Sequence, residues 1–163
     1  MTVEYSKNEI SELVDGKLSQ IEVNKFLSNY KDADRFQKYL EILQERVTWK
    51  EKIILPYALH LYIVQKGNKE RVVKCDCGHE FGDYKKNWKL QANIHIRNDK
   101  KSLEEIYPQM MHCDPKWMEL REYFCPGCNT LLEVEALPPG YPIVFDFEPD
   151  LELFYEKWLG KKL

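Results

Sequence analysis

The fold of this chain is decided by two short stretches, Cys75-Asp-Cys-Gly-His79 and Cys125-Pro-Gly-Cys-Asn129. Each stretch can present two thiolates from one tight turn. Two such turns brought together form a tetrahedral four-sulfur cage, the geometry of a structural zinc site. Gly78 can adopt the positive φ that such a turn needs, and Asn129 is the next most tolerant residue type. We therefore expect Cys75, Cys77, Cys125 and Cys128 to be metal ligands.

Other roles for the cysteines and their neighbours stay open at this point. His79 could complete the cage if Cys75 or Cys77 points away from it. Cys113 is expected to be a free thiol, buried or partly buried. A redox role for Cys125 and Cys128 would place them at a helix N-terminus, whereas the flanking residues favour strands. A closed four-thiolate site is structural, because catalytic zinc keeps an open position for water.

Charge and composition argue against several classes of function. The chain has 163 residues and a formal net charge of −3, without the concentrated basic patch of a nucleic-acid binder. The short run Lys85–Lys89 is interpreted as a solvated turn, and the acids Asp146, Glu148 and Asp150 as solvated surface or a helix cap. No glycine-rich phosphate loop, nucleophile elbow or catalytic triad spacing is present, so we predict no catalytic and no cofactor-binding residues.

The hydropathy pattern predicts a soluble, cytoplasmic protein. The N-terminus lacks the apolar core of a signal peptide. The longest apolar stretch, Ile53–Val64, is interrupted by Pro56 and His60 and is too short to span a bilayer as a helix. In a reducing compartment, clustered cysteines are metal ligands or redox thiols more often than disulfides.

The first third of the chain predicts three amphipathic helices. Ser6–Glu9 and Ser19–Glu22 each have the pattern of a capping box, followed by apolar residues at helical spacing. Asp32 is predicted to cap a third, longer helix. We expect residues 1–50 to form a helical N-terminal arm.

From Trp49 onward the pattern changes to strands. Predicted strands cover residues 53–55, 59–64, 71–74, 90–96, 121–124, 131–135 and, at an edge, 143–147, with a hairpin turn at 66–69. Ser102–Glu105 is predicted to cap a short inserted helix, and Asp150 to cap a C-terminal helix that stops at Gly160. The predicted class is α+β: a helical arm, then a zinc-ribbon-like antiparallel β domain over residues 51–163 with a helix-containing insertion and a C-terminal helix.

Several stretches, spread nearly end to end, resemble the γ subunit of acetone carboxylase and the small zinc-binding subunit of acetophenone carboxylase. They are Val14–Lys17, Tyr39–Arg46, Lys52–Pro56, Cys75–His79, Asn87–Leu90, Glu105–Pro108, Arg121–Pro126, Tyr141–Pro142 and Trp158–Gly160. The cysteine turns alone would be generic, but their combination with the helix and tryptophan stretches is specific.

The resemblance implies a hetero-oligomeric, ATP-dependent carboxylase that joins bicarbonate to a ketone and yields a β-keto acid. It implies that ATP and a further divalent metal bind only to larger catalytic α- and β-type subunits, which the small subunit holds together. Of the family's sites, only the structural zinc is carried over, onto Cys75, Cys77, Cys125 and Cys128. The isolated chain is then expected to be non-catalytic.

Two alternatives of other classes stay open from the residues. The chain could be a zinc-ribbon module that binds protein or nucleic acid, although its acidic balance speaks against nucleic acid. It could also be a dithiol redox enzyme, which would carry reactive thiols and no zinc.

Overall fold

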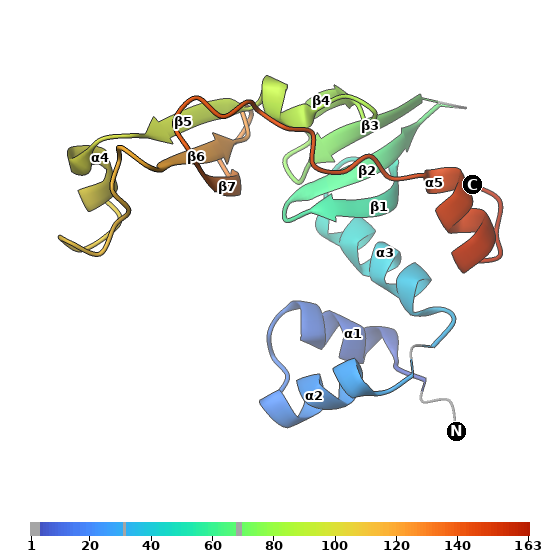
Figure 1. Cartoon of the computed structure of the whole chain (residues 1–163). Coiled ribbons are helices and arrows are strands. Elements are labelled where there is room, and N and C mark those ends of the chain that lie inside the picture. The colour runs from blue at the N-terminus through green and yellow to red at the C-terminus, as the bar shows by residue number, and fades with distance from the viewer. Residues whose placement is uncertain (1–3, 31, 68–69) are drawn as a thin grey trace. The chain divides into compact units, whose positions relative to one another are not determined.

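The computed structural model describes residues 4–30, 32–67 and 70–163. It divides the chain into two compact units, Met1–Ile53 with Pro149–Leu163, and Ile54–Glu148. The described residues form helices and two separate sheets, which confirms the predicted α+β class (Figure 1). The division into domains 1–50 and 51–163 stays a prediction. No helix among the described residues has the length and apolar composition needed to cross a membrane.

The first unit contains the three predicted N-terminal helices, α1 (Lys7–Val14), α2 (Gln20–Ser28) and α3 (Arg35–Arg46). Both predicted capping boxes are confirmed, because the Ser6 and Ser19 side chains accept from the amides of Glu9 and Glu22, and both glutamates bond back. A buried core cluster joins Tyr5, Ile10, Phe26 and Ile42 among the described residues of these helices and their flanks. The helices therefore begin where local hydrogen-bonding chemistry predicts.

The predicted cap of the third helix is wrong. Asp34 occupies the N-cap of α3 and makes no side-chain cap hydrogen bond. The buried Asp32 carboxylate instead accepts from Arg35 Nε at 2.6 Å and lies 3.6 Å from Lys38 Nζ. The Asp32 carboxylate is thus engaged by the guanidinium of Arg35 in a charge-assisted hydrogen bond, and the helix begins after Asp34.

The C-terminal helix lies in the same unit and consists of α5 (Leu151–Leu153) followed by the π-helical turn η2 (Phe154–Trp158). Asp150 accepts from the Leu153 amide at 2.9 Å, which confirms the predicted cap. Gly160 has φ +62°, consistent with the predicted stop. The Phe154 ring meets the Phe36 ring of α3 edge-on, with centroids 5.2 Å apart.

The second unit begins with a four-stranded sheet in the order β1-β2-β3-β4. Its strands are β1 (Lys52–Ala58), β2 (Leu61–Lys66), β3 (Glu70–Cys75) and β4 (Glu80–Asp83), of which the first two residues of β1 fall in the first unit. β3 is antiparallel to β2 and β4, and Leu61 lies opposite Cys75. The predicted turn at 66–69 includes residues 68 and 69, which lie outside the described residues.

A second, antiparallel sheet has the order β5-β6-β7. Its strands are β5 (Asn93–Arg97), β6 (Glu119–Phe124) and β7 (Leu131–Leu137), and the insertion between β5 and β6 carries α4 (Lys100–Glu104). The buried Trp88 ring packs edge-on against the rings of Phe81 in β4 and Tyr123 in β6, with ring centroids 5.7 Å and 6.0 Å apart. These three rings join the two sheets.

Three predictions of helix and strand boundaries in this unit are wrong. The strand predicted from Leu90 begins only at Asn93, because Trp88–Gln91 form a 3-10 turn, η1, which Asn87 caps. Ser102 was predicted to cap the inserted helix but lies inside α4, whose N-cap is Asp99. The Ser102 amide donates to the Asp99 carboxylate at 2.9 Å. A carboxylate at the N-cap is favoured by the helix dipole as well as by the hydrogen bond.

The third error concerns residues 143–147, which form no strand. The Ile143 carbonyl accepts from the Asn87 side chain at 3.4 Å, and the Phe147 carbonyl accepts from the Tyr57 hydroxyl. The backbone here bonds to side chains rather than to a neighbouring strand, so its apolar pattern does not produce a ladder.

Candidate metal centre

The first cysteine turn connects β3 to β4. Gly78 N donates to Cys75 O at 2.8 Å, and Cys75 N donates to His79 O at 2.9 Å. Gly78 has φ +95°, a conformation that residues with a side chain rarely adopt. The predicted role of this glycine is therefore confirmed, and both sulfurs leave from one closed turn.

The second cysteine turn, between β6 and β7, repeats this arrangement. Asn129 N donates to Cys125 O at 2.8 Å, and Cys125 N donates to Thr130 O at 2.9 Å. Asn129 has φ +58°, as its position after Cys128 predicted. Gly127 N lies 3.4 Å from Cys125 Sγ and points a backbone donor at the sulfur, which disperses thiolate charge.

The two turns bring four sulfurs together. The Sγ atoms of Cys75, Cys77, Cys125 and Cys128 all lie within 4.8 Å of one another. The Cys75–Cys128 separation is 3.8 Å and the Cys77–Cys125 separation is 3.7 Å. A tetrahedron with metal–sulfur bonds of about 2.3 Å has edges of about 3.8 Å. The sulfur positions thus fit a four-coordinate metal ion.

Burial and hydrogen bonding set the protonation of these thiols. Cys75 and Cys125 are fully buried, whereas Cys77 and Cys128 are exposed. Burial raises the pKa of Cys75 and of Cys77. The Thr130 hydroxyl, 3.2 Å from Cys128 Sγ, and the Thr130 amide lower the pKa of Cys128 to about 6. A bound divalent cation would favour the thiolate at every position, because the thiolate is the metal ligand.

His79 does not belong to this group of sulfurs. Its ring meets the Phe81 ring edge-on at a centroid distance of 5.0 Å. A Cβ placed on Gly127 would lie 3.0 Å from His79 Cβ and 3.3 Å from Cys77 Sγ. The His79 side chain therefore packs against the second turn, and glycine at 127 permits this close approach.

Cys113 also lies outside the group. Its thiol is half-buried, as predicted, and lies 3.6 Å from the Met118 carbonyl.

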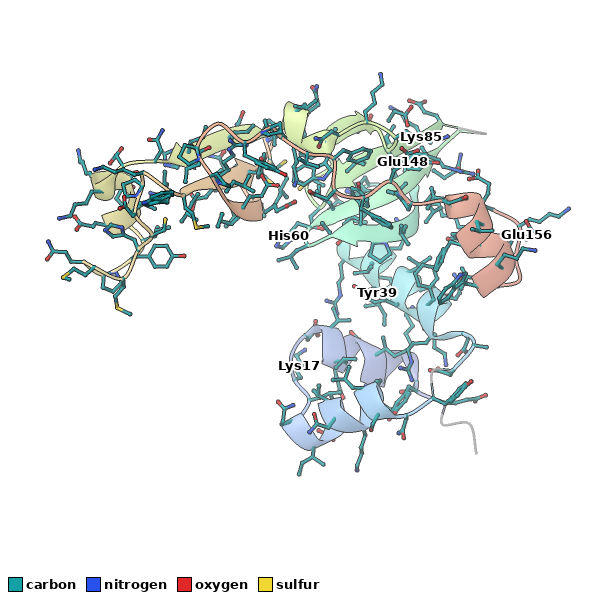
Figure 2. All side chains as sticks on the ribbon, in the orientation of Figure 1. Lys17, Tyr39, His60, Lys85, Glu148 and Glu156 are labelled. Atoms are coloured by element: carbon teal, nitrogen blue, oxygen red, sulfur yellow. The ribbon has the colours of Figure 1, made fainter. Side chains whose placement is uncertain are left out.

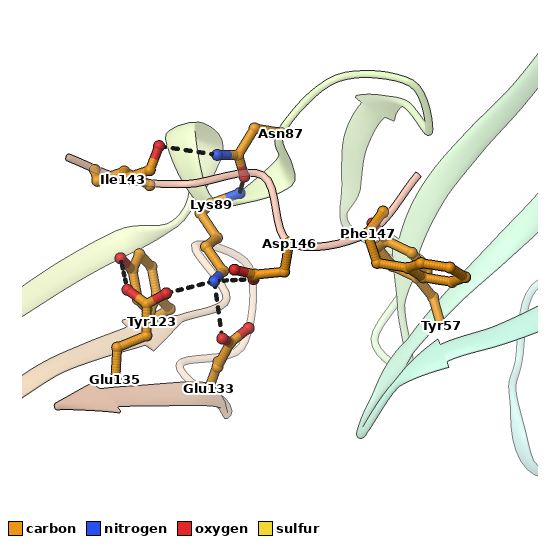
Figure 3. A network of polar contacts seen from close by, with 9 residues as sticks. All are labelled: Tyr57, Asn87, Lys89, Tyr123, Glu133, Glu135, Ile143, Asp146 and Phe147. Atoms are coloured by element: carbon orange, nitrogen blue, oxygen red, sulfur yellow. Dashed lines mark hydrogen bonds and ion pairs between the residues drawn. The ribbon is translucent and has the colours of Figure 1, made fainter. Parts of the chain in front are cut away.

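A second cluster was not predicted from the sequence. Lys89 is fully buried and its Nζ contacts Glu133 and Glu135 of β7 and Asp146 (Figure 3). The interpretation of residues 85–89 as a solvated turn is therefore wrong for Trp88 and Lys89, and Asp146 is an ion-pair partner. No local signal in the sequence marks Lys89 as buried, because its partners lie on distant parts of the chain.

Comparison with known proteins shows the family. A family model described as acetone carboxylase gamma subunit matches residues 47–159. The acetone carboxylase gamma subunit of Xanthobacter autotrophicus (strain ATCC BAA-1158 / Py2) is 51% identical over 157 residues, which cover 96% of this chain and 94% of that protein. The acetophenone carboxylase beta subunit of Aromatoleum aromaticum (strain DSM 19018 / LMG 30748 / EbN1) is 46% identical over 39 residues, 24% of this chain and 30% of that protein. The chain belongs to the acetone carboxylase gamma subunit family.

Proposed function

We propose that this chain is the structural, zinc-binding small subunit of an ATP-dependent ketone carboxylase of the acetone or acetophenone type. Such a complex joins a ketone and bicarbonate to a β-keto acid. The observation that carries the proposal is the 51% identity, over 96% of the chain, to an acetone carboxylase gamma subunit. ATP and a further divalent metal would bind to larger α- and β-type subunits in the cytoplasm.

The four cysteines support the zinc part of the proposal. Cys75, Cys77, Cys125 and Cys128 supply four sulfur donors at separations that suit zinc, and four thiolates leave no position for a catalytic water. The metal would supply structural cross-linking. The chain's own contribution is to hold the β3–β4 turn against the β6–β7 turn, with backbone donors such as Gly127 N directed at the sulfurs.

Exposed apolar side chains support a role in binding larger subunits. Met110, Met111 and Trp117, between α4 and β6, are 93%, 74% and 76% exposed. In the other unit, Tyr30 and Trp158 are 86% and 80% exposed. Methionine and aromatic residues are enriched in protein interfaces. Figure 2 shows the side chains over the whole described chain.

Affinity purification of the tagged full chain from its native host tests this proposal. We expect two larger subunits to co-purify, about one zinc per chain, and ketone carboxylation by the complex but not by the isolated chain. Carboxylation by the isolated chain, or salt-dependent capture of nucleic acid without large subunits, would overturn the proposal. Four reactive thiols without zinc would instead support a dithiol redox enzyme.

A further inference from the structure

A fully buried ammonium group lies among three carboxylates in the second unit. Lys89 Nζ lies 2.8 Å from Glu133 Oε1 and 2.6 Å from Glu135 Oε1, and it also donates to Asp146 Oδ2 (Figure 3). The Lys89 side chain is only 1% exposed. A buried lysine is rare unless it is paired, so this arrangement is a specific feature of the fold.

The electrostatics of the cluster depend on the ammonium. Burial acts to lower the pKa of Lys89, but hydrogen bonds to Asp146, Glu133 and Glu135 outweigh burial and raise it, so the group is charged. The carboxylate oxygens of the three acids lie within 4.8 Å of one another. Without a cation between them, the three negative charges would repel one another in a site partly shielded from water.

The three acids come from two parts of the chain. Glu133 and Glu135 are alternate residues of β7 and so project from the same face of the sheet. Asp146 belongs to the segment 138–148 that follows β7 and contains no helix or strand. The ammonium therefore connects an irregular segment to a regular strand.

Two further contacts hold the same segment. Asn87 Nδ2, at the cap of the turn that carries Lys89, donates to Ile143 O at 3.4 Å. The Tyr57 ring of β1 stacks on the Phe147 ring with a centroid distance of 6.2 Å and an interplanar angle of 23°, and the Tyr57 hydroxyl donates to the Phe147 carbonyl. Segment 138–148 is thereby connected to β7 of one sheet through the Lys89 ammonium, which contacts Asp146. It is connected to β1 of the other sheet through Phe147 (Figure 3).

We propose that Glu133, Glu135 and Asp146 form a cation site whose resident cation is the Lys89 ammonium, and that this site fastens segment 138–148 across the two sheets. The site is a further connection between the sheets, separate from the four cysteines and from the Trp88 ring contacts. It does not depend on the proposed function, since it involves neither the thiols nor a partner subunit.

Hydrogen exchange of the full chain, with its cysteine site loaded with zinc, tests the fastening. Lys89→Met keeps the length of the side chain and removes the charge. Asp146→Asn removes the carboxylate of the segment itself, and because the Asp146 side chain is half-exposed, this variant should fold. We expect the amides of residues 143–148, a stretch without proline, to exchange about tenfold faster or more in both variants, because each breaks the ion pair. Glu148→Gln changes an exposed acid of the same segment and should leave exchange unchanged.

Unchanged exchange of this segment in Asp146→Asn would overturn the fastening, and this variant decides the matter if Lys89→Met fails to fold. An equal increase in the exchange rate in Glu148→Gln would also overturn the fastening, because the effect would then reflect the loss of any negative charge rather than of the ion pair.

A calcium titration tests the cation site itself. Lys89→Ala removes the ammonium and leaves three carboxylates whose oxygens lie within 4.8 Å of one another. Calcium binds carboxylate oxygens at about 2.3–2.6 Å, so two opposed ligands are about 4.6–5.2 Å apart. We expect Ca²⁺ to slow exchange of residues 143–148 in Lys89→Ala, and to have no effect on the unsubstituted chain or on the double variant Lys89→Ala/Glu135→Gln. Absence of an effect in Lys89→Ala would overturn the assignment as a cation site.

Discussion

At the scale of single residues, the strongest prediction concerns the buried cysteine Cys75. Replacing it with serine removes one sulfur from the proposed cage. Metal binding in small zinc peptides contributes roughly 10–16 kcal/mol, which is comparable to the whole stability of a typical domain. We expect Cys75→Ser to lose bound zinc and to unfold at a markedly lower temperature, as measured by metal analysis and thermal unfolding.

Cys113→Ser is the matched control, because its thiol lies outside the four-sulfur group, 3.6 Å from the Met118 carbonyl. It should keep its zinc. Equal zinc content in the two serine variants would contradict a metal role for Cys75.

His79 allows a second prediction at this scale. The four sulfurs are close together without it, and its ring packs on Phe81. We expect His79→Ala to retain about one zinc per chain while losing stability of about 1 kcal/mol from the lost ring contact. A cobalt-substituted protein reports the ligands directly, since its absorption spectrum distinguishes four sulfurs from three sulfurs and a nitrogen. A spectrum that changes on His79→Ala would show that the histidine, and not a fourth cysteine, is a ligand.

The two clusters differ in how far the sequence could predict them. The cysteine group could be predicted because each turn has its own local signature in spacing, Gly78 and Asn129. The Lys89 cluster could not, because its partners Glu135 and Asp146 lie 46 and 57 residues further along the chain. Nothing local distinguishes a lysine with distant partners from a solvated one.

At the scale of helices and strands, predictions that depend on residues close together in the sequence hold, and those that depend on distant partners fail. The capping boxes at Ser6 and Ser19 depend on residues three positions apart, and both are present. The prediction at Asp32 is wrong because an arginine competes for the carboxylate, and the strand at 143–147 is absent because side chains from elsewhere take its carbonyls. The α+β class and the strand–turn–strand pattern around both cysteine pairs could therefore be predicted, whereas tertiary contacts decide the irregular parts.

The cap of α1 yields a prediction that depends on pH. Hydrogen bonds from the Ser6 side chain and amide lower the pKa of Glu9 below its ordinary 4.5. The Glu9 carboxylate thus binds a proton less readily in the folded state than in the unfolded state. The stability that Glu9 contributes to the cap is therefore fully present above pH 4.5, and it is lost as the pH falls through the lower pKa of the folded state. We expect Ser6→Ala to destabilise the helix by about 1 kcal/mol at neutral pH and by less in acid.

Urea unfolding followed by helical circular dichroism, at pH 7 and at pH values below 4, measures this difference. Ser28→Ala is the control, because Ser28 is the last residue of α2 and its hydroxyl donates to the Asn24 carbonyl rather than to a carboxylate. A Ser6→Ala effect that stays constant with pH would contradict a role for the Glu9 carboxylate in the cap.

At the scale of the whole chain, the two compact units differ in what stabilises them. The described helices of the first unit have their own apolar core, formed by Tyr5, Ile10, Phe26 and Ile42. In the second unit, the cysteine turns, the Trp88 contacts and the Lys89 cluster join two small sheets. Small sheets bury little apolar surface, so such cross-connections supply a large share of their stability.

Metal removal should therefore affect the units unequally. We expect a chelator at neutral pH to increase amide exchange most strongly in residues 70–83 and 119–137, which flank the cysteine turns, because metal-site energy is folding energy. Helices α1, α2 and α3 should keep their protection, since their core contains no cysteine. Exchange measured before and after chelation, and again after zinc is restored, gives the comparison. A uniform rise across both units would contradict this expectation and show that the chain unfolds as one cooperative body.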